Sequence, residues 1–481
     1  MSKRANKKVC IVIPTFKSWE ITAKTVNKLL YEQTYSHFDI IIVDAGSEDY
    51  EKLENLYKDE DRVIIIHSSK DLGSAGSFWL GMKYAYQEGY EVFILSDNDA
   101  IPISNNLIEK LVSEIENNCE FVLAPYEEGE ERLSLEDRSR LKVKGRPFHF
   151  LTLSRKVIER VGFPSVEFFI WHDDGEYCER IRKKFEIYIL TSIKYAHEFP
   201  PSTLHYFYSK RYHYNIRNQI LMYLKRWNKA NPKNFFVGLL RLIFRIFILQ
   251  ICIFVYAFFI KEKFKYIIRS LNSIFFAFMK NFGKIEDTSR IAKLYNLIGD
   301  EINEKEISKI QYDLILIPNF KINLENIKIP FNLKKDSISS KLYSNISDFE
   351  YALYLLKFYL IDPIFKVRKN ILALEFEAPN FVTAKTIVVY DIFQKKFLKI
   401  ENNFFYSFLY YLCSLLLSLM LTLLFTIILL FYEIKYPYKA ALKSWFDKEL
   451  LNLTYEVIRC KNLKKEIIST KDLNYLLSSV E

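Results

Sequence analysis

Two carboxylates separated by a single residue follow a short apolar run in the first quarter of the chain. The run Val92–Leu95 has the composition of a strand, and Asp97 and Asp99 come just after it. Residues i and i+2 of an extended segment project to the same side. Because Mg²⁺ and Mn²⁺ prefer hard oxygen ligands, Asp97 and Asp99 are candidates to bind one such ion together with a diphosphate. The alternative is a plain turn at the end of the strand.

A second pair with the same spacing, Asp59 and Asp61, lies in a charged, helix-like stretch. That setting is typical of a solvated helix face. The strand before Asp97 distinguishes the first pair, since ligand sites in open α/β sheets lie at the carboxyl ends of strands.

Two adjacent acids, Asp173 and Asp174, follow an aromatic stretch that ends at Trp171. Burial and like-charge repulsion would raise the pKa of at least one of them. Such a carboxylate could accept a proton from the hydroxyl of an acceptor molecule. Glu176 and Arg180 lie four residues apart on the helix expected next, a spacing that favours a structural ion pair.

Three residues at the ends of the first two expected strands lie on the same edge as Asp97. Pro14 and Thr15 end the first strand, and Asp44 ends the second. The Asp44 carboxylate could accept hydrogen bonds from a base or a ribose. Alternatively it caps the turn at Gly46 and Ser47, a common use of aspartate.

A loop of small residues and a distant histidine complete the set of candidates. Gly73 and Gly76 precede the helix that begins at Phe78, where free amide groups and the helix dipole favour phosphate, although a glycine pair before a helix is not specific. His197 ends another short apolar strand. It could be a third metal ligand through a ring nitrogen, or it could be structural.

The elements that position these residues alternate between strands and helices from Lys8 to about Tyr195. This alternation predicts an α/β domain with a mainly parallel sheet covered by helices on both faces. The clearest expected strands are 9–13, 40–43, 63–67 and 92–95, and the clearest helices are 19–32 and 78–88.

Taken in order, these motifs resemble those of family 2 glycosyltransferases, and within that family the rhamnosyl and galactofuranosyl transferase branch. The resemblance covers about the first 220 residues, and no single motif carries it. The matching segments are Pro14-Thr15, 43–47, 73–78, Asp97-Asn98-Asp99, 161–164 with Phe169, 173–176 with Arg180, His197 and 214–218.

The resemblance implies a GT-A fold, a nucleotide-diphosphate sugar donor, Mn²⁺ or Mg²⁺, and inversion at the anomeric carbon. Asp174 would be the general base. The other implied roles are metal binding by Asp97, Asp99 and His197; donor binding by Pro14, Thr15, Asp44, Gly73, Gly76 and Asp97; and shaping of the acceptor pocket by Asp173, Trp171 and His172. The departures are Asp71 in place of asparagine, Ser74 and Ser77 in place of glycine, and the insertion of His172 before the acidic pair.

The composition limits the possible partners. The 481 residues carry 68 basic and 58 acidic side chains, a net charge of +10, and much of the excess lies near apolar segments. This distribution favours an anionic membrane surface as partner over nucleic acid. The six cysteines have no Cys-x-x-Cys spacing, so neither a zinc site nor a disulfide framework is expected.

Two long apolar segments indicate a membrane-associated protein. Residues 235–260 contain Arg241 and Arg245, so we expect a helix in the membrane interface, with a true span as the alternative. Residues 404–432 contain no charge, and as a helix of about 44 Å they would exceed the roughly 30 Å hydrocarbon layer. They are predicted to form a transmembrane helix. The amino terminus lacks a secretory signal pattern, so the catalytic domain is expected on the cytoplasmic side.

The predicted organisation is a GT-A domain (1–230), membrane-interface helices (231–283), a small β-rich α+β domain of unknown role (284–403), a transmembrane helix (404–432) and a basic tail (433–481). The expected acceptor is a lipid-linked or membrane glycan. Two other functions stay open: a sugar nucleotidyltransferase, and an inactive membrane-anchored glycan-binding or scaffold protein. The first lacks its usual glycine- and arginine-rich signature here, and the second predicts lost carboxylates.

Overall fold

The computed structural model describes residues 8–117, 120–128, 139–198, 212–226, 232–285, 299–307, 309–311, 314–316, 356–357, 361, 368–373, 384–391, 396–451, 453–460 and 464–469. The chain divides into two compact units. The first, here called the sheet unit, comprises Met1–Phe199, Phe282–Ile285 and Lys439–Glu481. The second, the helical unit, comprises Pro200–Asn281 and Glu286–Tyr438.

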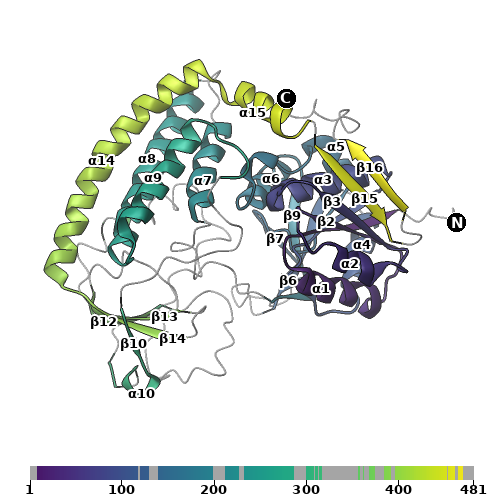
Figure 1. Ribbon diagram of the computed structural model, residues 1–481, viewed down its shortest axis with the longest axis horizontal. Coiled ribbons are helices and arrows are strands. Elements are labelled where there is room, and N and C mark those ends of the chain that lie inside the picture. Colours follow the sequence, from purple (N-terminus) through teal and green to yellow (C-terminus); the bar gives the residue numbers. More distant parts are fainter. Residues whose placement is uncertain are drawn as a thin grey trace. The chain divides into compact units, whose positions relative to one another are not determined.

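Four parallel strands form the centre of the sheet unit (Figure 1). They are β1 (Val9–Thr15), β2 (Asp39–Asp44), β3 (Val63–Ser68) and β4 (Val92–Leu95). All seven residues of β1 are buried, as expected for a central strand with helices on both faces. The register pairs Thr15 with Asp44 and Asp44 with His67, so the strand ends meet at one edge. The predicted parallel sheet is confirmed.

Helices on each face of this sheet bury alternate residues of its strands. They are α1 (Trp19–Glu32), α2 (Glu51–Tyr57), α3 (Gly73–Gln87) and α4 (Leu107–Asn117). Ile11 packs in the core on one face, and Val12 packs in the core on the other. On the second face α3 approaches so closely that a Cβ on Gly81 would lie 2.5 Å from a methyl carbon of Val12.

Antiparallel strands extend the sheet beyond β4. They are β5 (Ala100–Pro102), β6 (Phe121–Glu127), β7 (Arg140–Val143), β8 (Leu151–Ser154) and β9 (Glu186–His197). Among them lie α5 (Arg155–Val161), the 3₁₀ helix η1 (Val166–Phe168) and α6 (Asp173–Ile181). Strand β8 pairs with β4 and β5 pairs with β9, both antiparallel. These pairings position the candidate site.

The other edge of the sheet is completed by the carboxyl-terminal part of the chain. Helix α15 (Tyr438–Glu449) is followed by the hairpin β15 (Thr454–Arg459) and β16 (Lys464–Ser469). Strand β15 pairs antiparallel with β3, with Val457 opposite Ile66. The segment expected to be a basic tail therefore contributes two strands to the sheet.

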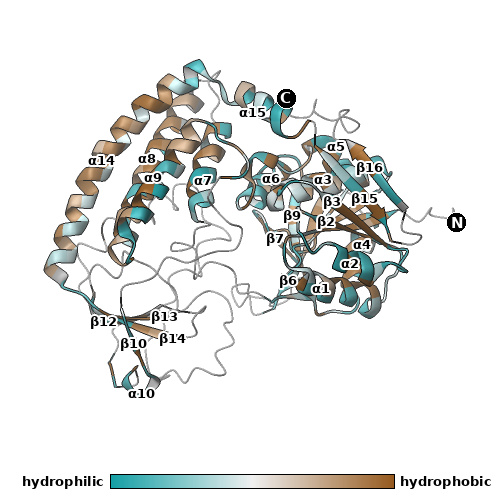
Figure 2. Cartoon of the chain, in the orientation of Figure 1, coloured by the Kyte–Doolittle hydropathy of each residue, from teal (hydrophilic) through white to brown (hydrophobic). Residues whose placement is uncertain are grey.

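The helical unit contains α7 (Tyr212–Arg226), α8 (Pro232–Phe258), α9 (Lys263–Phe278) and α14 (Phe404–Lys435). A separate sheet has the order β10 (Asp300–Ile302), β14 (Lys396–Glu401), β13 (Ala384–Asp391), β12 (Arg368–Ala373) and β11 (Leu314–Leu316), with the short helix α10 (Glu304–Ile307) after β10. In the described residues, Phe235–Phe258 and Phe405–Glu433 are long and apolar enough to cross a membrane. Figure 2 shows α14 as hydrophobic along most of its length.

Candidate functional site

Pairing of β4 with β8 brings His149 to Asp97. Leu95 lies opposite Leu151, and just beyond this pair the Asp97 amide donates to the Phe148 carbonyl at 2.6 Å. As a result His149 Nε2 lies 3.4 Å from Asp97 Oδ2. The sequence analysis did not identify His149.

Pairing of β5 with β9 brings His197 to Asp99. Ala100, directly after Asp99, is opposite His197, and the Glu198 amide donates to the Asp99 carbonyl at 3.0 Å. His197 Nε2 then lies 3.3 Å from Asp99 Oδ2. The predicted proximity of Asp99 and His197 is present.

Three side chains at this edge have a donor set that suits a divalent metal. One ligand atom from each of Asp99, His149 and His197 lies within 4.8 Å of the others. Nδ1 of His197 is buried and has no hydrogen-bond partner among the described residues. One carboxylate oxygen and two imidazole nitrogens are ligands that Mn²⁺ accepts. The residues present therefore fit a metal, with Asp97 beside the group through its contact with His149.

A short polar chain holds the His149 ring. Its Nδ1 lies 2.9 Å from the Tyr195 hydroxyl, which donates to Glu127 Oε2 at 2.9 Å. Such outer contacts fix the orientation of an imidazole ligand. His149 is buried, so its ring cannot swing freely into solvent.

Charges in this cluster shift one another's pKa values. Burial alone would raise the pKa of Asp99, but the contact with His197 and the charge of His149 outweigh it, and the pKa is lowered. Burial tends to lower the pKa of His197, but Asp99 raises it above the usual value. Burial, with help from His197, lowers the pKa of His149 to about 4. His149 is thus neutral at pH 7, the state that a metal ligand requires.

The acidic pair lies at the start of α6. Ser74 Oγ donates to Asp173 Oδ2 at 3.2 Å, and the Gly175 amide donates to Asp174 Oδ1 at 2.6 Å. Burial first, then the charges of Asp174 and Asp97, raise the pKa of Asp173 to about 8. Burial first, then Asp97, raise that of Asp174 to about 6, against the opposing amide contact. The charge of Asp97 reaches both acids, so the two acidic motifs lie near one another as predicted.

Backbone strain is concentrated around these residues. Phe169, Trp171 and His172, just before α6, have positive φ angles of 66°, 69° and 66°, and Phe150, next to His149, has φ 56°. Such conformations cost of order 1–3 kcal/mol each and persist where the surrounding structure holds them. The strain turns the chain so that α6 begins at Asp173.

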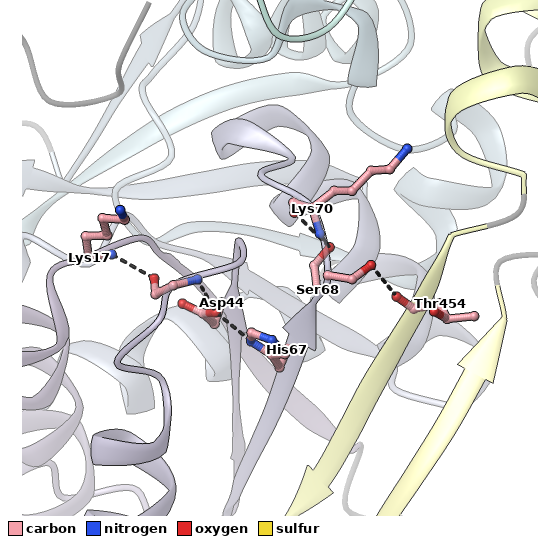
Figure 3. A network of polar contacts seen from close by, with 8 residues as sticks. Lys17, Asp44, His67, Ser68, Lys70 and Thr454 are labelled. Atoms are coloured by element: carbon pink, nitrogen blue, oxygen red, sulfur yellow. Dashed lines mark hydrogen bonds and ion pairs between the residues drawn. The ribbon is translucent and has the colours of Figure 1, made fainter.

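Asp44 is buried within a polar network, drawn in Figure 3. Its Oδ2 accepts from the Ser47 amide at 2.9 Å and lies 2.8 Å from His67 Nδ1. The Lys17 amide donates to Ser47 Oγ at 2.8 Å, and the Tyr50 ring stacks on His67. The turn-capping alternative for Asp44 is therefore present in the structure.

The ends of the first two strands are in register. Pro14 pairs with Val43, and the Thr15 hydroxyl accepts a hydrogen bond from Thr22 Oγ1 at 2.8 Å. The expected common edge of Thr15 and Asp44 is confirmed by their pairing.

The two loop glycines have a packing role. Gly73 has φ +69°, and a Cβ there would lie 2.0 Å from the Phe169 carbonyl oxygen. The Gly73 amide donates to Asp71 at 3.1 Å, and the Ala75 amide donates to Phe169 at 3.1 Å. At Gly76 a Cβ would lie 2.8 Å from the Leu72 Cβ. The glycines thus let the strained segment before α6 pack against α3.

The expected ion pair of Glu176 and Arg180 is confirmed. Arg180 Nε donates to Glu176 Oε1 at 2.7 Å, and its other nitrogens donate to the carbonyls of Val161 and Phe163 at 2.6 and 2.7 Å. This arrangement ties α6 to the end of α5.

With the site described, comparison with known proteins decides the family. A family model described as Glycosyl transferase family 2 matches residues 10–172. This part of the chain is a family 2 glycosyltransferase domain. Its fold is GT-A, in keeping with the mixed α/β sheet. The match contains Asp44, Asp97, Asp99 and His149 and ends one residue before Asp173.

Two curated relatives are glycosyltransferases. Over 119 residues the domain is 26% identical to WfgD of Escherichia coli, a UDP-Glc:alpha-D-GlcNAc-diphosphoundecaprenol beta-1,3-glucosyltransferase, covering 25% of this chain and 46% of the relative. Over 121 residues it is 26% identical to the glycosyltransferase GlyG of Streptococcus pneumoniae serotype 4, covering 24% and 38%. The matched stretch spans less than half the length of either relative.

Solved structures of glycosyltransferases are also similar to this glycosyltransferase. The mannosyltransferase PcManGT of Pyrobaculum calidifontis, in complex with GDP-Man and Mn²⁺, has a TM-score of 0.39 at 13% identity, covering 57% of this chain and 76% of that one. TarS 1–349 of S. aureus, in complex with UDP, has a TM-score of 0.34 at 14% identity, covering 45% and 65%.

Proposed function

We propose that this domain transfers a sugar from a nucleotide-diphosphate donor to the hydroxyl of an acceptor, with inversion at the anomeric carbon and with a divalent metal. The observation that carries the proposal is the cluster of Asp99, His149 and His197 at the same sheet edge as two carboxylates with raised pKa values. A metal-binding group and a general base are the two parts that such a transfer needs.

In this mechanism Asp99, His149 and His197 hold Mn²⁺ or Mg²⁺, with Asp97 beside them. The bound ion would neutralise the charge that develops on the departing diphosphate. Asp44 and Thr15, paired at the ends of β2 and β1, are the proposed contacts to the nucleotide, with Pro14 next to them. The packing of Gly73 and Gly76 supports the donor side indirectly, by positioning α3 against the segment before α6.

Asp174 is the proposed general base. It accepts the acceptor's hydroxyl proton while that oxygen attacks the anomeric carbon and the bond from this carbon to the diphosphate oxygen breaks. Because the pKa of Asp174 is raised to about 6, its carboxylate is a stronger base than an ordinary aspartate yet ionised at pH 7. Asp173, held by Ser74, and the strained residues Trp171 and His172 are proposed to shape the acceptor pocket.

A lipid-linked glycan on the cytoplasmic face is the proposed acceptor. The apolar helices α8 and α14 support a membrane location, and the printed name of the E. coli relative includes a diphosphoundecaprenol acceptor. Confining the enzyme and the acceptor to one surface would raise their effective concentration.

The test is release of nucleoside diphosphate from a panel of nucleotide sugars by the full-length protein in detergent with Mn²⁺. Asp99→Ala is the site variant. Asp59→Ala, in the exposed second Asp-x-Asp, is the matched control. We expect release by the wild type and the control, and its loss in Asp99→Ala and in EDTA. Release of pyrophosphate would indicate a nucleotidyltransferase, and no release with any donor would favour the inactive glycan-binding alternative.

A further inference from the structure

Helix α14 has two different faces. Its buried face carries small polar residues, among them Ser414, Ser418 and Thr422, and the helix contacts α8 where the Tyr410 hydroxyl donates to the Phe254 carbonyl at 3.0 Å. The opposite face is a stripe of exposed apolar side chains at helical spacing: Phe405, Leu409, Leu412, Leu416, Leu419, Leu423, Ile427 and Phe431. Helices in membranes pack through small residues and present large apolar ones to lipid.

Helix α9 exposes a second stripe of the same kind. Phe264, Ile268, Phe275 and Met279 are spaced by four, seven and four residues and are all exposed. The surrounding sequence is basic, with Lys261, Lys263, Lys265 and Arg269. A basic helix with an apolar stripe is suited to the interface of an anionic leaflet.

The path of the chain after α14 fixes the side of its carboxyl end. Helix α14 ends at Lys435, and β15 then pairs with β3 inside the sheet unit. Phe446 of α15 packs against Trp79 of α3, with ring centroids 5.8 Å apart. The chain after α14 is therefore on the same side of the membrane as the glycosyltransferase domain.

The chain is also on that side well before α14 begins. Residues Phe282–Ile285 belong to the sheet unit. The Gly283 amide donates to the Glu167 carbonyl at 2.9 Å, and Lys284 Nζ lies 3.4 Å from Asp71 Oδ2.

Little sequence separates residue 285 from the start of α14 in this topology. Residues 286–298 include Glu286, Asp287, Arg290 and Lys293, too charged and too few for a span of about 20 apolar residues. Strand β10 follows at once and pairs with β14, which ends at Glu401 just before α14. Both ends of α14 are thereby connected to the same side.

We propose that α14 does not cross the membrane but lies in its plane, with the leucine-rich stripe buried among the lipid acyl chains of one leaflet. The same parity applies to α8, because the chain returns to the sheet unit at Phe282 through α9, whose 16 residues span about 24 Å and include Lys263, Lys265 and Arg269. The helical unit is then a monotopic membrane-binding surface. This differs from the transmembrane helix that length and composition predict for 404–432.

Site-directed labelling on sealed vesicles of either orientation tests the proposal without an activity measurement. Cys119 and the exposed Cys413 are first replaced by serine. Single cysteines are then introduced as Lys385→Cys, exposed on β13 before α14, and Glu466→Cys, exposed on β16 after it. A membrane-impermeant maleimide is applied, and labelling in detergent defines the maximum for each variant.

We expect both cysteines to label from the same face, the face on which the glycosyltransferase domain lies. Lys385→Cys labelling only from the opposite face to Glu466→Cys would overturn the proposal and show that α8 and α14 cross as a pair. Trypsin gives a second readout on the unlabelled wild type. Cleavage in 299–401 from the same face as cleavage in 439–481 supports the proposal, and protection of 299–401 contradicts it.

Discussion

His149 Nε2 lies 3.4 Å from Asp97 Oδ2, although 51 residues separate the two in the chain. The contact exists because β8 runs antiparallel to β4, and it places a neutral, buried imidazole beside the Asp-x-Asp motif. The proposed metal set therefore has two histidines, one of which is held by Tyr195 and Glu127.

Replacing His149 is expected to weaken Mn²⁺ binding directly. In His149→Ala the dissociation constant for Mn²⁺, measured by electron paramagnetic resonance on the protein without donor, should rise at least about tenfold, since even outer-shell changes cost 10–100-fold at metal sites. His37→Ala, at an exposed histidine, should leave it unchanged. Equal affinities in the wild type and His149→Ala would remove His149 from the metal set.

The proposed general base can be separated from donor binding. Asp174→Asn keeps the shape of the side chain but cannot take a proton, so turnover should fall by about 10²- to 10⁴-fold while the affinity for nucleoside diphosphate with Mn²⁺ stays within about twofold. Single-turnover kinetics and calorimetry measure the two quantities. Turnover above about a tenth of the wild-type value would assign the base to another residue.

Activity should depend on pH through Asp174. The base works only when it is deprotonated, and its pKa is raised to about 6, so kcat/KM should rise with pH and level off above that value. A cation near Asp97 would lower this pKa, which places the acid limb at or below pH 6. A profile of kcat/KM from pH 4.5 to 8 tests this, and an acid limb centred near pH 7 or above would contradict it.

The raised pKa of Asp173 should cost the metal-free protein stability at neutral pH. The folded-state pKa of about 8 lies above the unfolded value of roughly 4. Between these values the folded protein holds a proton that the unfolded chain releases, so stability falls as pH rises from about 4 to 8.

Asp173→Asn removes this penalty. In EDTA its free energy of unfolding at pH 8 should exceed that of the wild type by at least on the order of 1 kcal/mol, since one pKa unit corresponds to about 1.4 kcal/mol. The difference should shrink toward pH 4. Denaturant titrations at both pH values measure it, and a variant less stable than the wild type at pH 8 would show that the carboxylate contributes a needed contact instead.

Local patterns predicted those parts of the site that lie at the ends of parallel strands. The apolar run before Asp97 and the polar residues after β1 and β2 place Thr15, Asp44 and Asp97 on one edge, and the structure pairs Thr15 with Asp44. Parallel strands in alternation with helices have a common direction, so their ends follow from the sequence pattern alone.

Residues that depend on antiparallel pairing were not predictable in the same way. His149 precedes a four-residue strand and has no motif of its own, so only the register of β8 against β4 reveals it. Gly73 was assigned to phosphate, but a close approach to the Phe169 carbonyl explains it better. The hairpin at 454–469 pairs with β3, nearly 400 residues earlier, and no local signal indicates a partner at such a distance.

Calorimetric titration of nucleoside diphosphate into the wild type, Asp99→Ala and Asp59→Ala, each with and without Mn²⁺, tests the central claim most directly. Binding to the wild type and to Asp59→Ala should be strong only with Mn²⁺, and the Mn²⁺-dependent part should vanish in Asp99→Ala. Affinity that is the same in all three proteins, or that does not depend on the metal, would contradict the account.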